Sequence, residues 1–171
     1  MKCTYRKVSA QDIDEFYRLR LEGLKKFPRA FWETPDEFTS KGLEFHKQRL
    51  EKVSEGRDSF IIGAFESDRL LGICGCKLED GVKGYHRAMI WGMYVSADFH
   101  GKGLGGAVLD AAIEEASKTE GLEYLFLFVA ADNLPAVRLY HSRGFRSYGL
   151  EPMSLKNEGE FVREFMMIKK L

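Results

Sequence analysis

The fold of this chain is decided by residues 90–106, which read Ile90-Trp91-Gly92-Met93-Tyr94-Val95-Ser96-Ala97-Asp98-Phe99-His100-Gly101-Lys102-Gly103-Leu104-Gly105-Gly106. The apolar start predicts a strand that ends at Val95, and apolar residues at helical spacing after the glycines predict a helix up to Gly121. The glycines between them let the backbone approach a ligand closely, because no Cβ stands in the way. A helix N-terminus also offers unpaired N–H groups. The turn therefore predicts an anion site, to which Lys102 adds a charge; a flexible glycine loop without a ligand is the alternative.

The same glycines satisfy the pattern G-x-G-x-x-G through Gly101, Gly103 and Gly106, so a dinucleotide-binding fold must be considered. Two features argue against it. That motif lies tight against its strand, whereas five residues separate Val95 from Gly101 here. An acidic residue should also close the next strand, and Asp132 stands just beyond that strand, which keeps the alternative open. A Walker A loop is excluded, because no Gly-Lys-Ser/Thr sequence follows.

Strand candidates on both sides of the turn define the expected fold class. Three of them precede it with short connections, at residues 60–65, 70–78 and 85–95, which implies an antiparallel meander. After the predicted helix come a buried strand at 122–129, a short helix from Asn133 to Gly144, and late strands at 145–148 and 161–168. Strand, helix and strand in this order favour a right-handed parallel crossover. We therefore expect a mixed α/β sheet, an antiparallel meander fused to one parallel βαβ unit.

The first third of the chain predicts two helices. Ser9 with Asp12 three positions later resembles an N-cap, and the apolar stripe that follows consists of Ile13, Phe16, Leu21 and Leu24. Residues 27–33 break the pattern. Thr34-Pro35 then begins a second helix, with proline at the first helical position and one side formed by Leu43, His46, Leu50 and Val53.

Composition limits the class of protein. At 171 residues, 44% of them hydrophobic and 30% charged, the chain suits one well-packed domain, residues 1–171. Lys plus Arg equals Asp plus Glu at 26 each, which gives no support to nucleic-acid or acidic-membrane binding. The N-terminus has no apolar signal segment and no apolar run approaches a membrane span, so we expect a cytoplasmic protein. Cys74 and Cys76 alternate on a predicted strand and are interpreted as core residues.

Two motifs together resemble those of the GNAT family of N-acetyltransferases. His100-Gly101-Lys102-Gly103-Leu104-Gly105 is similar to the family's Arg/Gln-x-x-Gly-x-Gly/Ala, with His in place of Arg or Gln at the first position. Residues 133–145 (Asn-Leu-Pro-Ala-Val-Arg-Leu-Tyr-His-Ser-Arg-Gly-Phe) resemble its Asn-x-x-Ala-x-x-x-Tyr-x-x-x-Gly-Phe. The ending Arg163-Glu164-Phe165-Met166-Met167-Ile168 resembles its last strand. The resemblance covers nearly the whole chain and implies a single GNAT domain that uses acetyl-CoA as co-substrate.

The resemblance also implies roles for particular residues. The backbone of Met93, Tyr94 and Val95 would contact the pantetheine arm, which suits the pairing of a peptide-like ligand with a sheet edge. The pyrophosphate would be held by the turn, made of His100, Gly101, Lys102, Gly103, Leu104, Gly105 and Gly106. Asn133 would contact the CoA arm, and it is also a candidate N-cap ahead of Pro135. Tyr140 would be the general acid that protonates the departing thiolate.

The base and the acceptor are less defined. Some family members use a Glu on the strand before the glycine turn, but residues 90–95 contain no carboxylate. Candidate substitutes are Glu33, Glu37, Glu79 and His86, and the sequence does not choose among them. By position in the family fold, Phe31, Trp32 and Glu33 are candidates for contacting the amine, since two aromatics beside a carboxylate attract a cation; anchoring of the loop in the core is their alternative role.

The function implied is acetyl transfer from acetyl-CoA to a primary amine of an unidentified small molecule or peptide, by direct attack in a ternary complex. The four histidines show no metal-ligand spacing, so no metal is expected. Two alternatives stay open: a CoA-binding sensor without turnover, and an NAD(P)-dependent oxidoreductase. Acyl groups longer than acetyl also stay open, as does a homodimer formed through the edge strands.

Overall fold

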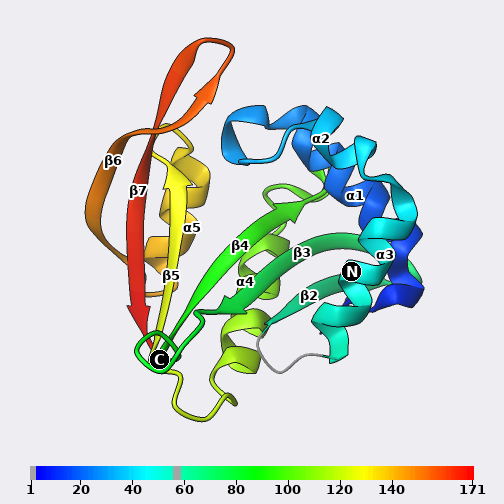
Figure 1. The fold of residues 1–171 in the computed structure, drawn as a ribbon, viewed down its shortest axis with the longest axis horizontal. Coiled ribbons are helices and arrows are strands. Elements are labelled where there is room, and N and C mark those ends of the chain that lie inside the picture. The colour runs from blue at the N-terminus through cyan, green and yellow to red at the C-terminus, as the bar shows by residue number, and fades with distance from the viewer. Residues whose placement is uncertain (1–2, 56–58) are drawn as a thin grey trace.

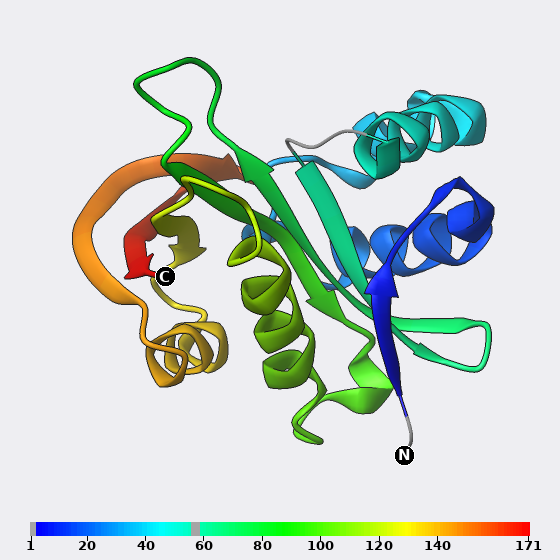
Figure 2. The same cartoon turned by 90° about the horizontal axis from the view of Figure 1, so that it is seen from below.

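The computed structural model describes residues 3–55 and 59–171, and it contains a twisted sheet with helices on both faces (Figures 1 and 2). The seven strands lie in the order β1-β2-β3-β4-β5-β7-β6. Their bounds are β1 Thr4–Lys7, β2 Ser59–Glu66, β3 Arg69–Leu78, β4 Arg87–Val95, β5 Tyr124–Ala130, β6 Arg146–Asn157 and β7 Glu160–Lys170. The α-helices are α1 Ile13–Lys26, α2 Pro35–Ser40, α3 Gly42–Glu55, α4 Leu104–Ala116 and α5 Leu134–Ser142. No helix in the described part of the chain is both long enough and apolar enough to cross a membrane.

The expected fold class is confirmed. Strands β2, β3 and β4 pair antiparallel in sequence order, and β4 pairs with β5 in parallel after the α4 crossover. Two expectations need correction. The helix expected from Pro35 to Val53 is two helices, because Gly42 adopts a left-handed φ of +77° that ends the first. Strand β1 was not expected, since Thr4–Lys7 is short and exposed on every residue and therefore carries no apolar pattern.

Two hydrophobic cores hold the helices against the sheet. One lies between the sheet and α4 with α5, and the other lies between the opposite face and α1 with α3 (Figure 2). Cys74 and Cys76 are completely buried in the first core, which confirms their interpretation as core residues. Burial raises the pKa of the Cys76 thiol to about 12, so this group stays a neutral thiol at ordinary pH.

The sheet opens where β4 and β5 separate. These strands pair only through Arg87–Met89 and Tyr124–Phe126, and beyond Met89 they diverge (Figure 1). Past that point β4 stays paired with β3, while β5 stays paired with β7. Strand β4 also carries a bulge: Trp91 faces Gly75 and Tyr94 faces Ile73, so two residues of β4 oppose one of β3. Gly92, the first residue of the bulge, has a left-handed φ of +61°.

Candidate functional site

A cavity of about 270 Å³ lies beside the bulge and the glycine turn. It gathers most of the residues that the sequence assigned to cofactor binding: Met93, Tyr94, Val95, His100, Gly101, Gly103, Leu104, Gly105, Asn133 and Tyr140. Phe27, Ala30 and Phe31, from the end of α1 and the connection that follows it, form another part of its wall. Lys102 and Gly106, also predicted for this site, do not line the cavity.

The glycine turn has the geometry that an anion site requires. Gly101 and Gly103 have left-handed φ values of +72° and +79°, which side chains strongly disfavour. The first backbone bond of α4 runs from the Ala107 N–H to the Gly103 carbonyl oxygen, at 3.2 Å. The N–H groups of residues 104–106 therefore have no partner within the helix and are available to a phosphate.

The side chains around the turn support its shape. His100 Nε2 lies 2.7 Å from the Val95 carbonyl oxygen, and because a carbonyl only accepts, Nε2 carries the proton. The His that replaces the family's Arg or Gln thus ties the turn to the end of β4. Lys102 packs its Nζ 5.0 Å from the centroid of the Phe99 ring. A Cβ at Gly106 would collide with the Arg143 guanidinium, so the missing side chain makes room for Arg143.

Asn133 is the N-cap residue of α5 and Tyr140 lies within that helix, and both line the cavity. The Asn133 carboxamide accepts a hydrogen bond from the Ala136 N–H at 3.3 Å, so its predicted N-cap role is confirmed. Tyr140 is only 8% exposed, and its hydroxyl lies 3.5 Å from the Met93 sulfur on the bulge. Burial raises the pKa of Tyr140, because ionisation would place an uncompensated charge in an apolar site.

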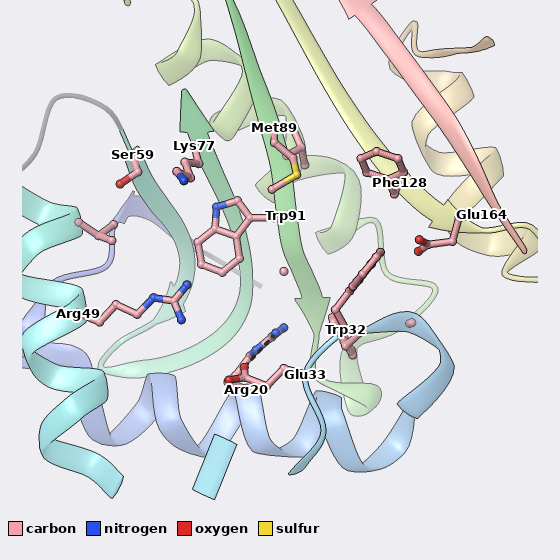
Figure 3. Close-up of a pocket in the computed structure, with 15 residues that line it drawn as sticks. Arg20, Trp32, Glu33, Arg49, Ser59, Lys77, Met89, Trp91, Phe128 and Glu164 are labelled. Carbon is pink, nitrogen blue, oxygen red and sulfur yellow. Dashed lines mark ion pairs between the residues drawn. The ribbon is translucent and has the colours of Figure 1, made fainter. Parts of the chain in front are cut away.

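A second cavity, of about 720 Å³, is shown in Figure 3, and it shares part of its wall with the first. Phe31, Trp32 and Glu33, the predicted acceptor contacts, all line it. Trp32 is 69% exposed and is therefore not a core anchor for its loop. The other wall residues include Arg20, Arg49, Lys77, Met89, Trp91, Gly92, Phe128 and Glu164. Ala30 and Phe31 belong to both cavities, and adjacent parts of β4 line each, so the two cavities meet at the bulge.

Of the carboxylates considered from the sequence as a base, only Glu33 lies in the cavity. Its Oε1 is 2.6 Å from Lys41 Nζ and its Oε2 is 3.6 Å from Arg20 Nη2, so two cations share it. Glu37 instead caps its own helix by accepting from Thr34, and Glu79 pairs with Arg87 at 3.5 Å. His86, the remaining candidate, lines neither cavity.

The sequence missed a second carboxylate in this cavity, that of Glu164. Its side chain is only 2% exposed, and its Oε2 accepts a hydrogen bond from Ser154 Oγ at 2.5 Å. Strand pairing sets Glu164 opposite Ala130, at the end of β5 where the sheet is open. The strand was expected, but nothing in its residues shows that it pairs with β5 in this register.

Among the described residues, no three His, Cys, Asp or Glu side chains converge in a way that could hold a metal ion.

Comparison with known proteins identifies the family. Residues 21–145 match the model of the acetyltransferase (GNAT) family. The chain belongs to the GNAT family. This GNAT chain is 27% identical over 143 residues to an uncharacterized N-acetyltransferase of Methanocaldococcus jannaschii. The aligned region covers 83% of this chain and 60% of that protein. It is also 36% identical over 88 residues to a mycothiol acetyltransferase of Actinosynnema mirum. That aligned region covers 52% of this chain and 28% of the relative.

Solved structures share the fold of this GNAT chain. A GNAT acetyltransferase from Streptococcus pneumoniae superposes with a TM-score of 0.88 at 22% identity, over 99% of this chain and 100% of the other. An acetyltransferase from Salmonella typhimurium, solved with acetyl-CoA, gives a TM-score of 0.85 at 19% identity, over 100% of this chain and 95% of the other. The mixed sheet with one parallel strand pair is therefore the GNAT fold. The chain spans only 60% of the length of the Methanocaldococcus relative.

Proposed function

We propose that residues 1–171 form one GNAT domain that transfers the acetyl group of acetyl-CoA to a primary amine, which attacks directly in a ternary complex. The observation that carries the proposal is that the two cavities meet. Both are lined by Ala30 and Phe31, and adjacent parts of β4 at the bulge line one and the other. One cavity has the glycine turn and the unpaired helix amides that suit a pyrophosphate. The other is large enough for a small acceptor or the end of a peptide.

The donor would lie along the open edge of β4. Because β4 leaves β5 after Met89, no strand among residues 3–55 and 59–171 pairs with the backbone of residues 93–95 on that side. A pantetheine arm carries amides and can pair with such an edge as an added strand does. The pyrophosphate would then reach the amides of residues 101–106, and Asn133 would flank the arm from α5. Acetyl-CoA bound to the Salmonella neighbour of the same fold supports this donor.

The chemical step would take place at the bulge. The amine nitrogen attacks the thioester carbonyl carbon, the C–N bond forms, and the C–S bond breaks to release CoA. A backbone N–H of the bulge can stabilise the oxyanion that develops, an effect typically worth about 3 kcal/mol. Tyr140, whose hydroxyl lies beside Met93, would protonate the departing thiolate. Burial raises the pKa of Tyr140. The same apolar surroundings would raise the pKa of the CoA thiol, so the difference between the two pKa values would be smaller than the shift of Tyr140 alone implies.

The proton lost by the amine needs an acceptor, and we assign this role to Glu164. A primary ammonium has a pKa near 10.4 in water and must be deprotonated before it attacks. The carboxylate oxygens of Glu33 already lie within ion-pair distance of Arg20 and Lys41. Glu164 has no cation within ion-pair distance in the described part of the chain, and it lies on the wall next to the sheet opening. It can act directly or through one water.

Thermal melting with acetyl-CoA, CoA, NAD and NADP tests the donor. A ligand that binds only the folded protein stabilises it by about 2.7 kcal/mol at a hundred times its Kd, so acetyl-CoA and CoA should each raise Tm. Release of free CoA thiol in the presence of an amine panel then tests transfer. No rise with either CoA species up to millimolar concentration would refute the proposal. A rise with NAD alone would favour an oxidoreductase, and CoA binding without transfer would favour a sensor.

A further inference from the structure

The guanidinium of Arg20 lines the larger cavity, and one of its nitrogens is a buried donor without a hydrogen-bond partner among the described residues. Arg20 is only 8% exposed, and its Nη1 has no hydrogen-bond partner among the described residues. Its Nη2 has Glu33 at the long distance of 3.6 Å, and its plane stacks over Phe31 with Cζ 4.6 Å from the ring centroid. A buried charge with an unpaired donor is costly unless a ligand supplies the partner.

Two further cations face the same cavity. Arg49 projects from α3 toward Trp91, with Cζ 5.7 Å from the ring centroid, and Lys77 projects from β3 (Figure 3). Neither has a carboxylate within ion-pair distance among the side chains that the structure describes. Burial lowers the pKa of Arg20, Glu33 opposes that shift, and the nearby Arg49 lowers the pKa further. This wall therefore has more positive charge than its own carboxylates neutralise.

The backbone leaves space beside the unpaired nitrogen. Gly92 lies in the bulge with its open side toward Arg20, and a Cβ built there would stand 3.6 Å from Nη1. Any side chain at this position would occupy the space next to the guanidinium. The glycine thus leaves room for a ligand group beside Arg20.

We propose that the acceptor amine also carries an anionic group, a carboxylate or a phosphate, which binds to Arg20 and Arg49. Glu164 lies on the opposite wall, across Trp91 and Trp32 from Arg49 (Figure 3). A bifunctional acceptor would place its ammonium toward Glu164 and its anion toward the two arginines. Between them Met89, Trp91 and Phe128 offer apolar surface to the connecting carbons. Polycations such as spermidine suit this wall poorly, because like charges would meet there.

This inference rests on the proposed function and narrows its substrate class. Its test is binding to the CoA-saturated protein, measured by calorimetry, of matched pairs that differ only in the anion. The pairs are 4-aminobutanoate with 4-aminobutanamide, phenylalanine with phenylalaninamide, and 2-aminoethyl phosphate with ethanolamine. We expect at least one anionic member to bind ten times or more tightly than its partner. A preference in the first two pairs alone would identify a carboxylate, and one in the third pair alone a phosphate.

Arg49→Gln is the decisive variant, because Arg49 is exposed and its loss should leave the fold intact. It should reduce the anion preference at least tenfold. Lys52→Gln removes the same charge from the same helix without touching the cavity, and it should keep the full preference. Arg20→Lys keeps a positive charge at this position but replaces the guanidinium with a single ammonium group. It should also weaken binding of the anionic member of each pair. A preference that survives in Arg49→Gln and Arg20→Lys would overturn the assignment.

Other outcomes separate this inference from the function beneath it. If no anionic member binds more tightly than its neutral partner, or if spermidine is acetylated faster than every anionic amine, the inference is wrong while acetyl transfer stands. If acetyl-CoA and CoA fail to raise Tm, the proposed function itself is wrong.

Discussion

At the scale of single residues, Tyr140, the proton donor that we propose, combines a place on the cavity wall with a strongly held proton. Its hydroxyl reaches the bulge at Met93, and burial raises its pKa above the usual value near 10. The phenol therefore stays neutral through the whole physiological range. A donor of this kind is present at every working pH, so its ionisation should not limit the rate below pH 10.

Tyr140→Phe removes the proposed proton donor and little else, since the ring remains in place. We expect kcat to fall by about 100-fold with the KM for acetyl-CoA nearly unchanged, because the lost interaction forms as the thiolate departs. Steady-state assays between pH 6 and 10 would measure this. A variant with wild-type kcat would show that another group, or water, protonates CoA.

Glu164→Gln tests the other proton transfer. The amide keeps the shape and can still bond to Ser154, but it cannot take a proton from the ammonium, so kcat should fall by about 100-fold. Glu151→Gln is the matched control, since Glu151 is paired opposite Glu164 on the neighbouring strand and is exposed. Equal losses in both variants would point to damage in the hairpin and away from a base.

At the scale of elements, Glu22 ties α1 to the end of β4. Its carboxylate accepts hydrogen bonds from Tyr94 Oη at 2.9 Å, Ser96 Oγ at 3.1 Å and the Ala97 N–H at 3.2 Å. Burial alone would raise the pKa of Glu22, but bonds from the Ala97 amide, Tyr94 and Ser96 outweigh it and hold the pKa below its usual value. The helix and the glycine turn are thus fixed to each other by one ionised side chain.

Glu22→Gln should lower the free energy of unfolding by about 2 kcal/mol at pH 7, since hydrogen bonds to a charged group are lost. The folded-state pKa is depressed, so this stabilisation is complete above the unfolded pKa near 4.3 and disappears as pH falls through the folded pKa. The gap between wild type and variant in urea unfolding should therefore shrink below pH 4. Glu120 is exposed, and its side chain has no hydrogen bond among the residues that the structure describes, so Glu120→Gln should unfold with the same free energy as wild type at both pH values.

Most elements were predictable because their signals are local. The alternation of β2 and β3, the helical stripe of α4 and the Asn133-Leu134-Pro135 start of α5 all lie within one segment. The errors have non-local or single-residue causes. Strand β1 exists only because β2 offers it an edge, and the break at Gly42 depends on one left-handed residue inside an otherwise helical pattern.

At the scale of the whole molecule, the sequence predicted more of the cavity proposed for the donor than of the cavity proposed for the acceptor. The residues predicted for the donor side lie in two contiguous motifs, 93–106 and 133–145. Those that line the first cavity together are Met93, Tyr94, Val95, His100, Gly101, Gly103, Leu104, Gly105, Asn133 and Tyr140. The cavity proposed for the acceptor includes residues from α1, α3, β3 and β7. No local sequence pattern predicts how these elements pair and pack against one another. The sequence did not indicate that Arg20, Arg49 and Glu164 line this cavity. Phe31, Trp32 and Glu33 line it too, and their contact with the amine, inferred from the family's arrangement, stays a prediction.

Phe31 joins the two halves, because it lines both cavities. Phe31→Ala should therefore raise the KM values for acetyl-CoA and for the amine together, each by about tenfold or 1.4 kcal/mol. Phe27→Ala, which touches the first cavity alone, should raise only the KM for acetyl-CoA. Two-substrate kinetics distinguish the cases, and a change in one KM alone for Phe31→Ala would show that the cavities work separately.

Beyond Met89, β4 and β5 are no longer paired with each other, although both stay in the same sheet. A pantetheine arm paired with the free side of β4 would act as an added strand, so the coenzyme would be part of the sheet. The half of the sheet that carries β5, β6 and β7 would then be held to the other half by the coenzyme as well as by three residue pairs. Loss of the coenzyme would weaken the architecture itself, and the abundance of the folded protein would follow the supply of its own co-substrate.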